Sequence, residues 1–193
     1  LPLQYGEDSI LAAMNRRYRV ADFAELAGHA AAALPGLCLG SDVIVGFPGE
    51  TEATFQACCE AVRRLPINHL HVFTFSARRG TPAAALPNRV PGDLARCRAA
   101  ELSRLGRDKA AAFAHSQVGR CLEVLTEAVS TAGLWEGWSD NYLRVTIGAD
   151  AGLEANRLVP VWIDRVDPDG GTLLGHRAAP AASARSGRGR AMV

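Results

Sequence analysis

A short turn between two regular elements constrains this chain more than any other feature. The apolar run Leu37–Val45 ends in a Gly-Phe-Pro-Gly turn at residues 46–49, and a helical pattern begins directly after it at Thr51. Glycines let other groups approach the main chain closely, and the first N–H groups of a helix have no partner inside the helix. The pattern predicts a ligand site at the carboxyl end of a parallel strand. A turn whose glycines serve only steric needs is the alternative, and spacing alone does not separate the two.

The elements around this turn alternate between strand and helix. Strands are predicted over Leu37–Val45 and His69–Phe75, with a helix from Thr51 to about residue 65 between them and a long helix over about residues 93–116. Shorter helices are expected over residues 8–18 and from Asp22 onward. A strand–helix–strand unit of this length favours a parallel sheet or barrel. We expect residues 1–118 to form an α/β domain whose strands are buried on both faces.

The pattern changes at Gly119. Short apolar runs over residues 121–125, 142–147, 158–163 and 172–175 alternate with Gly, Asp and Asn. Short strands at regular spacing predict a small β-barrel over residues 119–176. Residues 177–193 are mainly Ala, Ser, Gly and Arg, so a disordered basic tail is expected there.

Composition fits a globular protein, with 48% hydrophobic residues and a formal net charge of +1. Residues 120–175 carry 4 Lys or Arg against 9 Asp or Glu, so overall charge does not argue for nucleic-acid binding. No apolar run approaches the ~20 residues of a membrane span, and the chain does not open on a signal-peptide pattern. A cytoplasmic location without membrane association is expected.

The cysteines do not predict a metal site. Their number is odd, and only Cys58 and Cys59 lie close together, whereas iron–sulfur ligands need several closely spaced thiolates. We expect all five to be packing residues. His69 and His71 share one face of a strand, where packing or polar lining is favoured over metal binding because a third ligand is missing.

Several separated segments resemble, in the same order, the radical S-adenosylmethionine (SAM) enzymes that add methylthio groups to tRNA. The segments cover residues 1–4, 14–18, 42–51 and 71–84, and the chain beyond Gly119 resembles the TRAM domain that ends these enzymes. The segment Gly137–Val145 is most similar to the branch that modifies threonylcarbamoyladenosine. The resemblance implies a carboxyl-terminal fragment: the carboxyl half of a partial radical-SAM barrel, which is TIM-like, followed by a small all-β TRAM barrel.

The resemblance also implies an activity. The complete enzyme would cleave SAM reductively and methylthiolate carbon 2 of threonylcarbamoyladenosine next to the anticodon of tRNA, with 4Fe-4S clusters and a reductant protein. The cysteines that would hold those clusters are absent from this chain, so we expect no activity from it alone. Isopentenyladenosine or a ribosomal protein are alternative substrates within the class. A non-catalytic RNA-binding module is the alternative outside it.

Individual positions receive cofactor roles from the same resemblance. SAM would lie across the carboxyl ends of the barrel strands, with the turn backbone near its adenosine and polar groups near its ribose and methionyl ends. Arg16 would bind an anionic group, the alternative being a surface arginine near a helix C-terminus. The residues expected to bind the cofactor are Gln4, Arg16, Asp42, Gly46, Phe47, Pro48, Gly49, Glu50, Phe73 and Ser76.

Substrate contacts are expected in a loop and in the small barrel. Arg78 and Arg79 lie in a Gly/Pro-rich loop where they could contact phosphate, although exposed paired arginines are common. In the barrel, rings that stack and groups that hydrogen-bond suit an unpaired base; the alternative is that the rings pack the barrel. These barrel residues are Trp138, Asn141, Tyr142 and Arg144. No catalytic residue is expected in this chain.

Overall fold

The computed structural model describes residues 1–168 and 170–178 of the 193-residue chain. The chain divides into two compact units, Leu1–Ser116 and a second unit that begins at Gln117. Among the described residues, each strand pairs only within its own unit. The tail predicted for residues 177–193 lies outside the described residues from position 179 onward, whereas Arg177 is the last residue of a strand.

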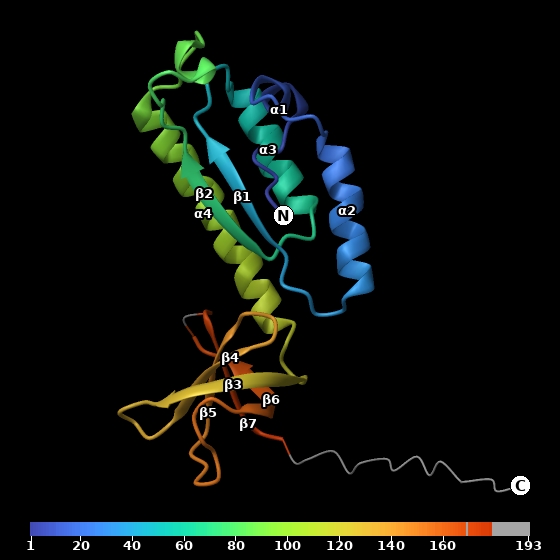
Figure 1. Ribbon diagram of the computed structural model, residues 1–193, viewed down its shortest axis with the longest axis vertical. Coiled ribbons are helices and arrows are strands. Elements are labelled where there is room, and N and C mark those ends of the chain that lie inside the picture. The colour runs from blue at the N-terminus through green and yellow to red at the C-terminus, as the bar shows by residue number, and fades with distance from the viewer. Residues whose placement is uncertain (169, 179–193) are drawn as a thin grey trace, which may run out of the picture. The chain divides into compact units, whose positions relative to one another are not determined.

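The first unit contains a strand–helix–strand–helix succession (Figure 1). The two predicted strands and the two longer predicted helices are confirmed, with ends shifted by a few residues. Among the described residues, no helix has the length and apolarity needed to cross a membrane. The elements are α1 (Asp8–Ala13), α2 (Val20–Ala33), β1 (Gly40–Val45), α3 (Glu52–Arg64), β2 (His69–Thr74), the 3-10 helix η1 (Pro82–Ala85) and α4 (Gly92–His115).

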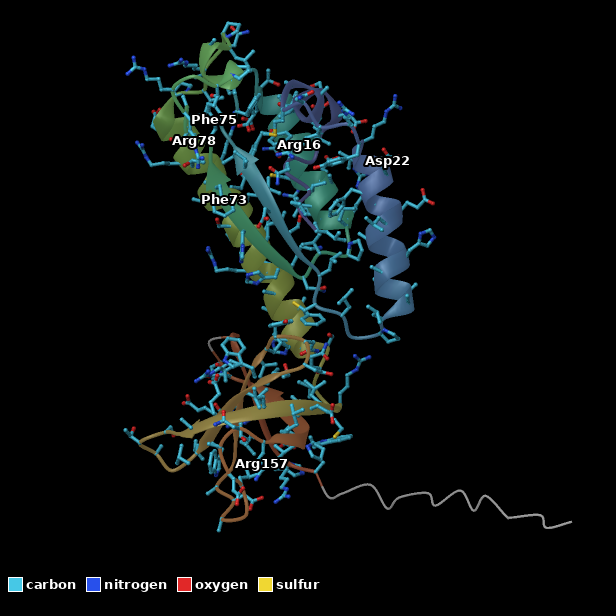
Figure 2. The ribbon with its side chains drawn as sticks, viewed as in Figure 1. Arg16, Asp22, Phe73, Phe75, Arg78 and Arg157 are labelled. Atoms are coloured by element: carbon cyan, nitrogen blue, oxygen red, sulfur yellow. The ribbon has the colours of Figure 1, made fainter. Side chains whose placement is uncertain are left out.

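The start of α2 differs from the prediction. The sequence predicted a helix from Asp22, whereas α2 begins at Val20 after the N-cap residue Arg19. Asp22, labelled in Figure 2, is the third helical residue, and its carboxylate accepts a hydrogen bond from Arg19 N at 2.9 Å. A carboxylate in the first turn satisfies a free N–H group and opposes the positive end of the helix dipole. Asp22 therefore supports the start of this helix from inside it.

The first unit is organised by a parallel strand pair. β1 and β2 run in register from Gly40 opposite His69 to Val45 opposite Thr74. Gln4 adds an isolated parallel bridge on the other side of β1, where Gln4 N donates to Asp42 O at 2.8 Å and Ile44 N donates to Gln4 O at 2.9 Å. Three segments far apart in sequence therefore lie side by side at this sheet.

The two faces of the sheet differ. Ser41, Val43 and Val45 are buried on the face that packs on the helices, whereas the alternate residues of β1 are only half-buried. The prediction that the strand is buried on both faces is therefore wrong for the described structure. On β2 the alternation continues, and Phe73 is 52% exposed. The open face carries the polar and aromatic side chains Asp42, His69, His71 and Phe73.

The second unit is a closed five-stranded barrel with the strand order β3-β4-β5-β7-β6. The predicted small β-barrel is confirmed, but β4 was missed and the segment predicted to start at residue 142 becomes a strand only at Arg144. Neighbouring strands are antiparallel except β5 and β7. Gly137 is needed in β4 because a Cβ there would overlap Leu125 O of β3. The strands are β3 (Cys121–Val129), β4 (Trp135–Ser139), β5 (Arg144–Ile147), β6 (Leu158–Val166) and β7 (Thr172–Arg177).

Candidate ligand site at the carboxyl ends of the parallel strands

The turn after β1 has the backbone that its glycines predict. Gly46 and Gly49 have φ values of 78° and 92°, in the region that favours glycine. A Cβ on Gly46 would lie 2.7 Å from Ala95 Cβ of α4, whereas a Cβ on Gly49 would meet nothing within 4 Å. The steric alternative therefore accounts for Gly46, which packs against a helix.

The carboxylate of Glu50 closes this turn from inside. Glu50 Oε2 accepts a hydrogen bond from Gly46 N at 2.8 Å, and Glu50 Oε1 accepts one from Arg98 Nη1 at 2.7 Å. The Glu50 side chain is fully buried, so its carboxylate faces the protein interior. Sequence reasoning placed Glu50 among the cofactor contacts and did not identify Arg98.

A cavity of about 320 Å³ opens next to the turn. The rings of Phe47 and Phe75 meet edge to face in its wall, with centroids 5.1 Å apart. Arg16 Nη2 donates to Gln4 Oε1 at 3.1 Å, and Gln4 has a φ of 67° while its main chain is bound to β1. Figure 2 shows Arg16 and Phe75 at the same end of the unit. This cavity, named the Phe47–Phe75 cavity, is lined by Gln4, Ala13, Met14, Asn15, Arg16, Ile44, Phe47, Phe75, Thr81, Pro82 and Ala83.

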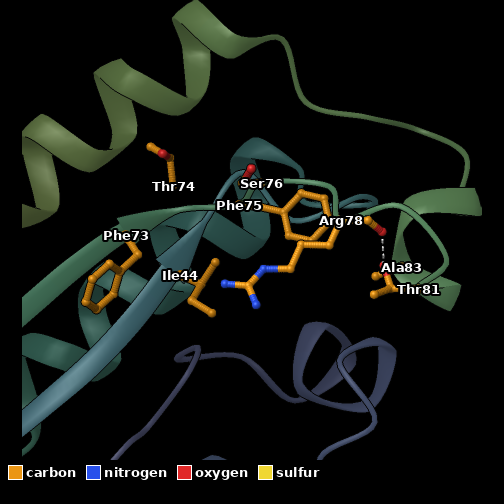
Figure 3. Close-up of a pocket in the computed structure, with 8 residues that line it drawn as sticks. All are labelled: Ile44, Phe73, Thr74, Phe75, Ser76, Arg78, Thr81 and Ala83. Atoms are coloured by element: carbon orange, nitrogen blue, oxygen red, sulfur yellow. Dashed lines mark hydrogen bonds between the residues drawn. The ribbon is translucent and has the colours of Figure 1, made fainter.

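A second cavity, of about 440 Å³, shares part of this wall (Figure 3). The side chain of Arg78 extends toward Ile44, and Arg78 O accepts a hydrogen bond from Thr81 Oγ1 at 2.7 Å. Its lining has no carboxylate among the described residues, so the guanidinium lies in a mainly apolar setting. The lining comprises Ile44, Phe73, Thr74, Phe75, Ser76, Arg78, Thr81 and Ala83.

The structure brings together six of the residues expected at a ligand or substrate site. Gln4, Arg16 and Phe47 line the first cavity, and Phe73, Ser76 and Arg78 line the second. Gly46 and Pro48 instead line a third cavity of about 360 Å³ with Arg89 and Arg96. Gly49 lines none of these three cavities, and its N–H group donates to Asn88 O at 2.9 Å. Arg79 lines none of them either. The residues that sequence reasoning missed are Asn15, Thr81 and Arg98.

Asp42 lies with two histidines on the open face of the sheet. Its Oδ1 is 3.4 Å from His71 Nδ1, and His71 Nε2 lies 2.8 Å from His69 Nε2. Partial burial and the neighbouring His71 lower the pKa of His69. A separation of 2.8 Å suits an N–H···N hydrogen bond. Within the described part of the chain, no group of three or more His, Cys, Asp or Glu side chains is placed to hold a metal ion.

The barrel residues expected to contact RNA fall into two sets. Tyr142 is 80% exposed, with a φ of 62°, and Trp138 is 42% exposed, so packing inside the barrel does not explain these rings. Asn141 is buried instead: its Nδ2 donates to Gln117 Oε1 at 3.1 Å, and its Oδ1 accepts from Ser139 Oγ at 2.7 Å. Asn141 thus holds the turn that presents Tyr142.

Arg144 is held by two carboxylates on the barrel surface. It donates to Glu136 Oε2 at 2.6 Å and to Glu127 Oε2 at 2.8 Å, and its guanidinium carbon lies 5.3 Å from the Trp138 ring centroid. The hydrogen bonds that Arg144 donates to Glu136 and to Glu127 raise the pKa of Arg144, the one to Glu136 more. A phosphate would have to compete with these two carboxylates.

Comparison with known proteins gives several relatives. The chain is 41% identical over 133 residues to tRNA-2-methylthio-N(6)-dimethylallyladenosine synthase of Maricaulis maris, a match that covers 69% of this chain and 29% of that protein. It is 35% identical over 149 residues to threonylcarbamoyladenosine tRNA methylthiotransferase MtaB of Bacillus subtilis, covering 75% of this chain and 33% of that protein.

A third relative covers most of the chain. The tRNA-2-methylthio-N(6)-dimethylallyladenosine synthase of Cereibacter sphaeroides is 39% identical over 178 residues, which are 92% of this chain and 40% of that protein. No protein-family model matches the chain. The chain therefore spans between 29% and 40% of the length of these three relatives.

Proposed function

This chain belongs to the radical-SAM tRNA methylthiotransferase family, and on that basis we propose that it forms part of a tRNA-modifying enzyme. Residues 1–118 are the carboxyl half of a partial radical-SAM barrel, and residues 119–176 are a TRAM domain. The complete enzyme methylthiolates carbon 2 of threonylcarbamoyladenosine next to the anticodon. It acts with tRNA and a reductant protein in the cytoplasm.

The pair of adjoining cavities carries this proposal. They lie where the parallel strands end, the position at which α/β folds place ligands. The rings of Phe47 and Phe75 offer an apolar wall to an adenine, and Arg16 with Gln4 offers polar groups to the methionyl carboxylate or the ribose. These residues fit the adenosyl and methionyl parts of SAM. SAM bound there would supply the chemistry of the family, with one molecule undergoing reductive cleavage and a separate molecule donating the methyl group.

The cysteines of this chain do not fit an iron–sulfur cluster. Cys58 and Cys59 are buried in the hydrophobic core of the first unit, where burial raises the pKa of Cys58 to about 12 and that of Cys59 to about 11, whereas cluster ligands lie close together on an accessible loop. Cys38 is half-buried, and Cys97 and Cys121 are exposed on elements of different units. The chemistry that depends on a cluster therefore needs ligands from outside these residues.

The substrate is proposed to meet the chain at two surfaces. Arg78, beside the Phe47–Phe75 cavity, provides a guanidinium for an anionic group of the tRNA. On the barrel, Trp138 and Tyr142 provide exposed rings for stacking on unpaired bases. Arg144 supports the Trp138 ring while bound to Glu127 and Glu136, so its contribution is to stacking more than to phosphate binding.

Three other functions compete with this one. By their names, relatives act on dimethylallyladenosine as well as on threonylcarbamoyladenosine, so dimethylallyladenosine (isopentenyladenosine) is the nearest alternative substrate. A ribosomal protein is a further alternative substrate. The exposed rings of the barrel favour, as a separate candidate, a non-catalytic RNA-binding module.

Mass spectrometry of tRNA nucleosides tests the proposal. The complete coding region is expressed in a bacterial strain that lacks methylthiolated adenosines, and the nucleosides are separated and weighed. We expect 2-methylthio-threonylcarbamoyladenosine. The 2-methylthio derivative of isopentenyladenosine alone would reassign the substrate. Absence of both products, from a soluble complete protein that binds tRNA, would favour the RNA-binding module.

A further inference from the structure

Glu50 and Arg98 form an ion pair inside the first unit although they lie 48 residues apart in sequence. Arg98 Nη1 and Glu50 Oε1 are 2.7 Å apart, and the two side chains are 5% and 0% exposed. Removing charges from water is costly, and the short contact offsets only part of that cost because the buried Arg98 Nε has no hydrogen-bond partner among the described residues. Each partner therefore depends on the other for its place.

The second carboxylate oxygen of Glu50 connects the ion pair to the turn after β1. Glu50 Oε2 accepts from Gly46 N at 2.8 Å, and Glu50 N donates to Phe47 O at 3.0 Å. Hydrogen bonds to an ionised carboxylate are stronger than those between neutral groups. The orientation of the Gly46 amide is thus set by the carboxylate that Arg98 aligns.

Arg98 is itself fixed in place by its neighbours. Its Nη2 donates to Glu52 Oε2 at 3.0 Å, and its guanidinium carbon lies 5.2 Å from the centroid of the Phe55 ring. Three residues earlier on α4, Ala95 packs against Gly46. Residues three apart lie on the same side of a helix. One side of α4 therefore holds the turn at two points, by packing at Ala95 and by charge at Arg98.

We propose that Arg98 is a positioning residue for the ligand site: acting through Glu50, it fixes the Gly46 amide and, with it, Phe47 in the cavity wall. Arg98 lines none of the three cavities described above, so its effect on a ligand is indirect. This inference rests on the proposed function because it takes the Phe47–Phe75 cavity to be the adenosyl site. The link from Arg98 to the turn holds without a ligand.

The variants are chosen to separate positioning from folding. Arg98→Met alone leaves a buried carboxylate without its cation and is expected to destabilise the unit. The double variant Arg98→Met/Glu50→Gln removes both charges together and leaves a neutral amide near Gly46 N. Arg104→Met is the matched control, since Arg104 lies on the same helix in an exposed ion pair with Asp108.

Two measurements on the full 193-residue chain test the proposal. The first is the amide hydrogen exchange of Gly46 by NMR, and the second is the affinity for S-adenosylhomocysteine. In the folded double variant, we expect Gly46 to exchange at least about tenfold faster and the affinity to fall about tenfold, as for the loss of one charge-assisted hydrogen bond. The control should match the wild type in both.

The outcomes separate this inference from the proposed function. A folded double variant with wild-type Gly46 exchange and wild-type affinity would overturn the role of Arg98. If the wild type does not bind S-adenosylhomocysteine, the assigned cavity is wrong, and Gly46 exchange still decides whether Arg98 holds the turn. If the double variant does not fold, Arg98→Lys takes its place: it keeps one charge contact to Glu50, and intermediate exchange of Gly46 is expected.

Discussion

The rings of Phe47 and Phe75 meet edge to face, with an interplanar angle of 71°. Phe47 belongs to the turn after β1, and Phe75 follows the last residue of β2. Phe75 N also donates to Val45 O at 2.8 Å, which continues the parallel pairing past the end of β2. The contact therefore ties together the two chain segments that wall the cavity.

Phe75→Leu should lower the stability of the first unit by about 0.5–1.5 kcal/mol, because it keeps an apolar side chain but removes the aromatic pair. Urea unfolding followed by far-ultraviolet circular dichroism reports on this unit, which contains all the described helices. Phe73→Leu is the control, since Phe73 is 52% exposed and its ring contact is with His71. Equal losses in the two variants would argue against a stabilising ring pair.

Gly46→Ala should destabilise the chain more than Gly49→Ala. Both replacements place a Cβ at positive φ, which costs about 1–2 kcal/mol, but only the one at Gly46 also meets Ala95. The clash should add about 1–3 kcal/mol. Adding Ala95→Gly to Gly46→Ala should restore the stability lost to the clash but not the stability lost to the positive φ. Thermal unfolding measures both losses. If the two single variants were equally stable, packing against α4 would not explain Gly46.

Glu7→Ala should lower stability at neutral pH by about 1 kcal/mol, because Glu7 caps α1. Partial burial opposes ionisation, but hydrogen bonds from the Ser9 hydroxyl and from the N–H groups of Ser9 and Ile10 hold the pKa of Glu7 below its usual value. A lowered folded-state pKa means that the contribution is complete above the usual pKa of about 4.3 and is lost as the pH falls through the folded-state value.

Denaturant unfolding of this variant over a pH series measures that loss. The difference in the free energy of unfolding between the wild type and Glu7→Ala should decrease only as the pH falls below the usual pKa of a glutamate. Glu60→Ala is the control, because Glu60 is exposed and its ion-pair partner within the described part of the chain is Arg64, one turn further along α3. A difference that does not change with pH would show that the carboxylate charge is not what caps the helix.

Tyr142→Ala should leave the barrel folded, with a change in stability within about 0.5 kcal/mol, because the side chain is 80% exposed. Affinity for tRNA should fall by about 1–3 kcal/mol if the ring stacks on a base. Asn141→Ala is the contrasting variant: it breaks buried hydrogen bonds and should cost about 1–3 kcal/mol of stability. Tryptophan fluorescence reports the unfolding of the barrel, because Trp135, Trp138 and Trp162 all lie in its strands. Unchanged tRNA affinity in folded Tyr142→Ala would remove Tyr142 from the proposed RNA surface.

The sequence predicted those features of the fold that local patterns determine. Thr51 caps α3 as expected, accepting a hydrogen bond from Thr54 N, and the apolar runs became β1, β2 and most of the barrel. The missed strand β4 is short and interrupted by Gly137, which sheet packing requires but which a sequence pattern associates with a turn.

The remaining features depend on long-range contacts. Arg98 lies in an arginine-rich helix, and nothing local distinguishes it from the exposed Arg96 and Arg104; its partner Glu50 is 48 residues away. The same limit applies to Arg144, whose carboxylate partners become visible only when β3, β4 and β5 pair. The apolar run Leu37–Val45 suggested that β1 is buried on both faces. The polar residue Asp42 within this run was the signal that one face is open.

We propose that the Phe47–Phe75 cavity binds the adenosyl group of SAM. NMR of the full chain titrated with S-adenosylhomocysteine tests it most directly. We predict the largest shift changes at Gln4, Arg16, Phe47 and Phe75, with Overhauser contacts between adenine protons and both phenylalanine rings. Saturable binding whose shift changes fall instead on Arg89 and Arg96 of the third cavity, or on the barrel, would contradict the claim.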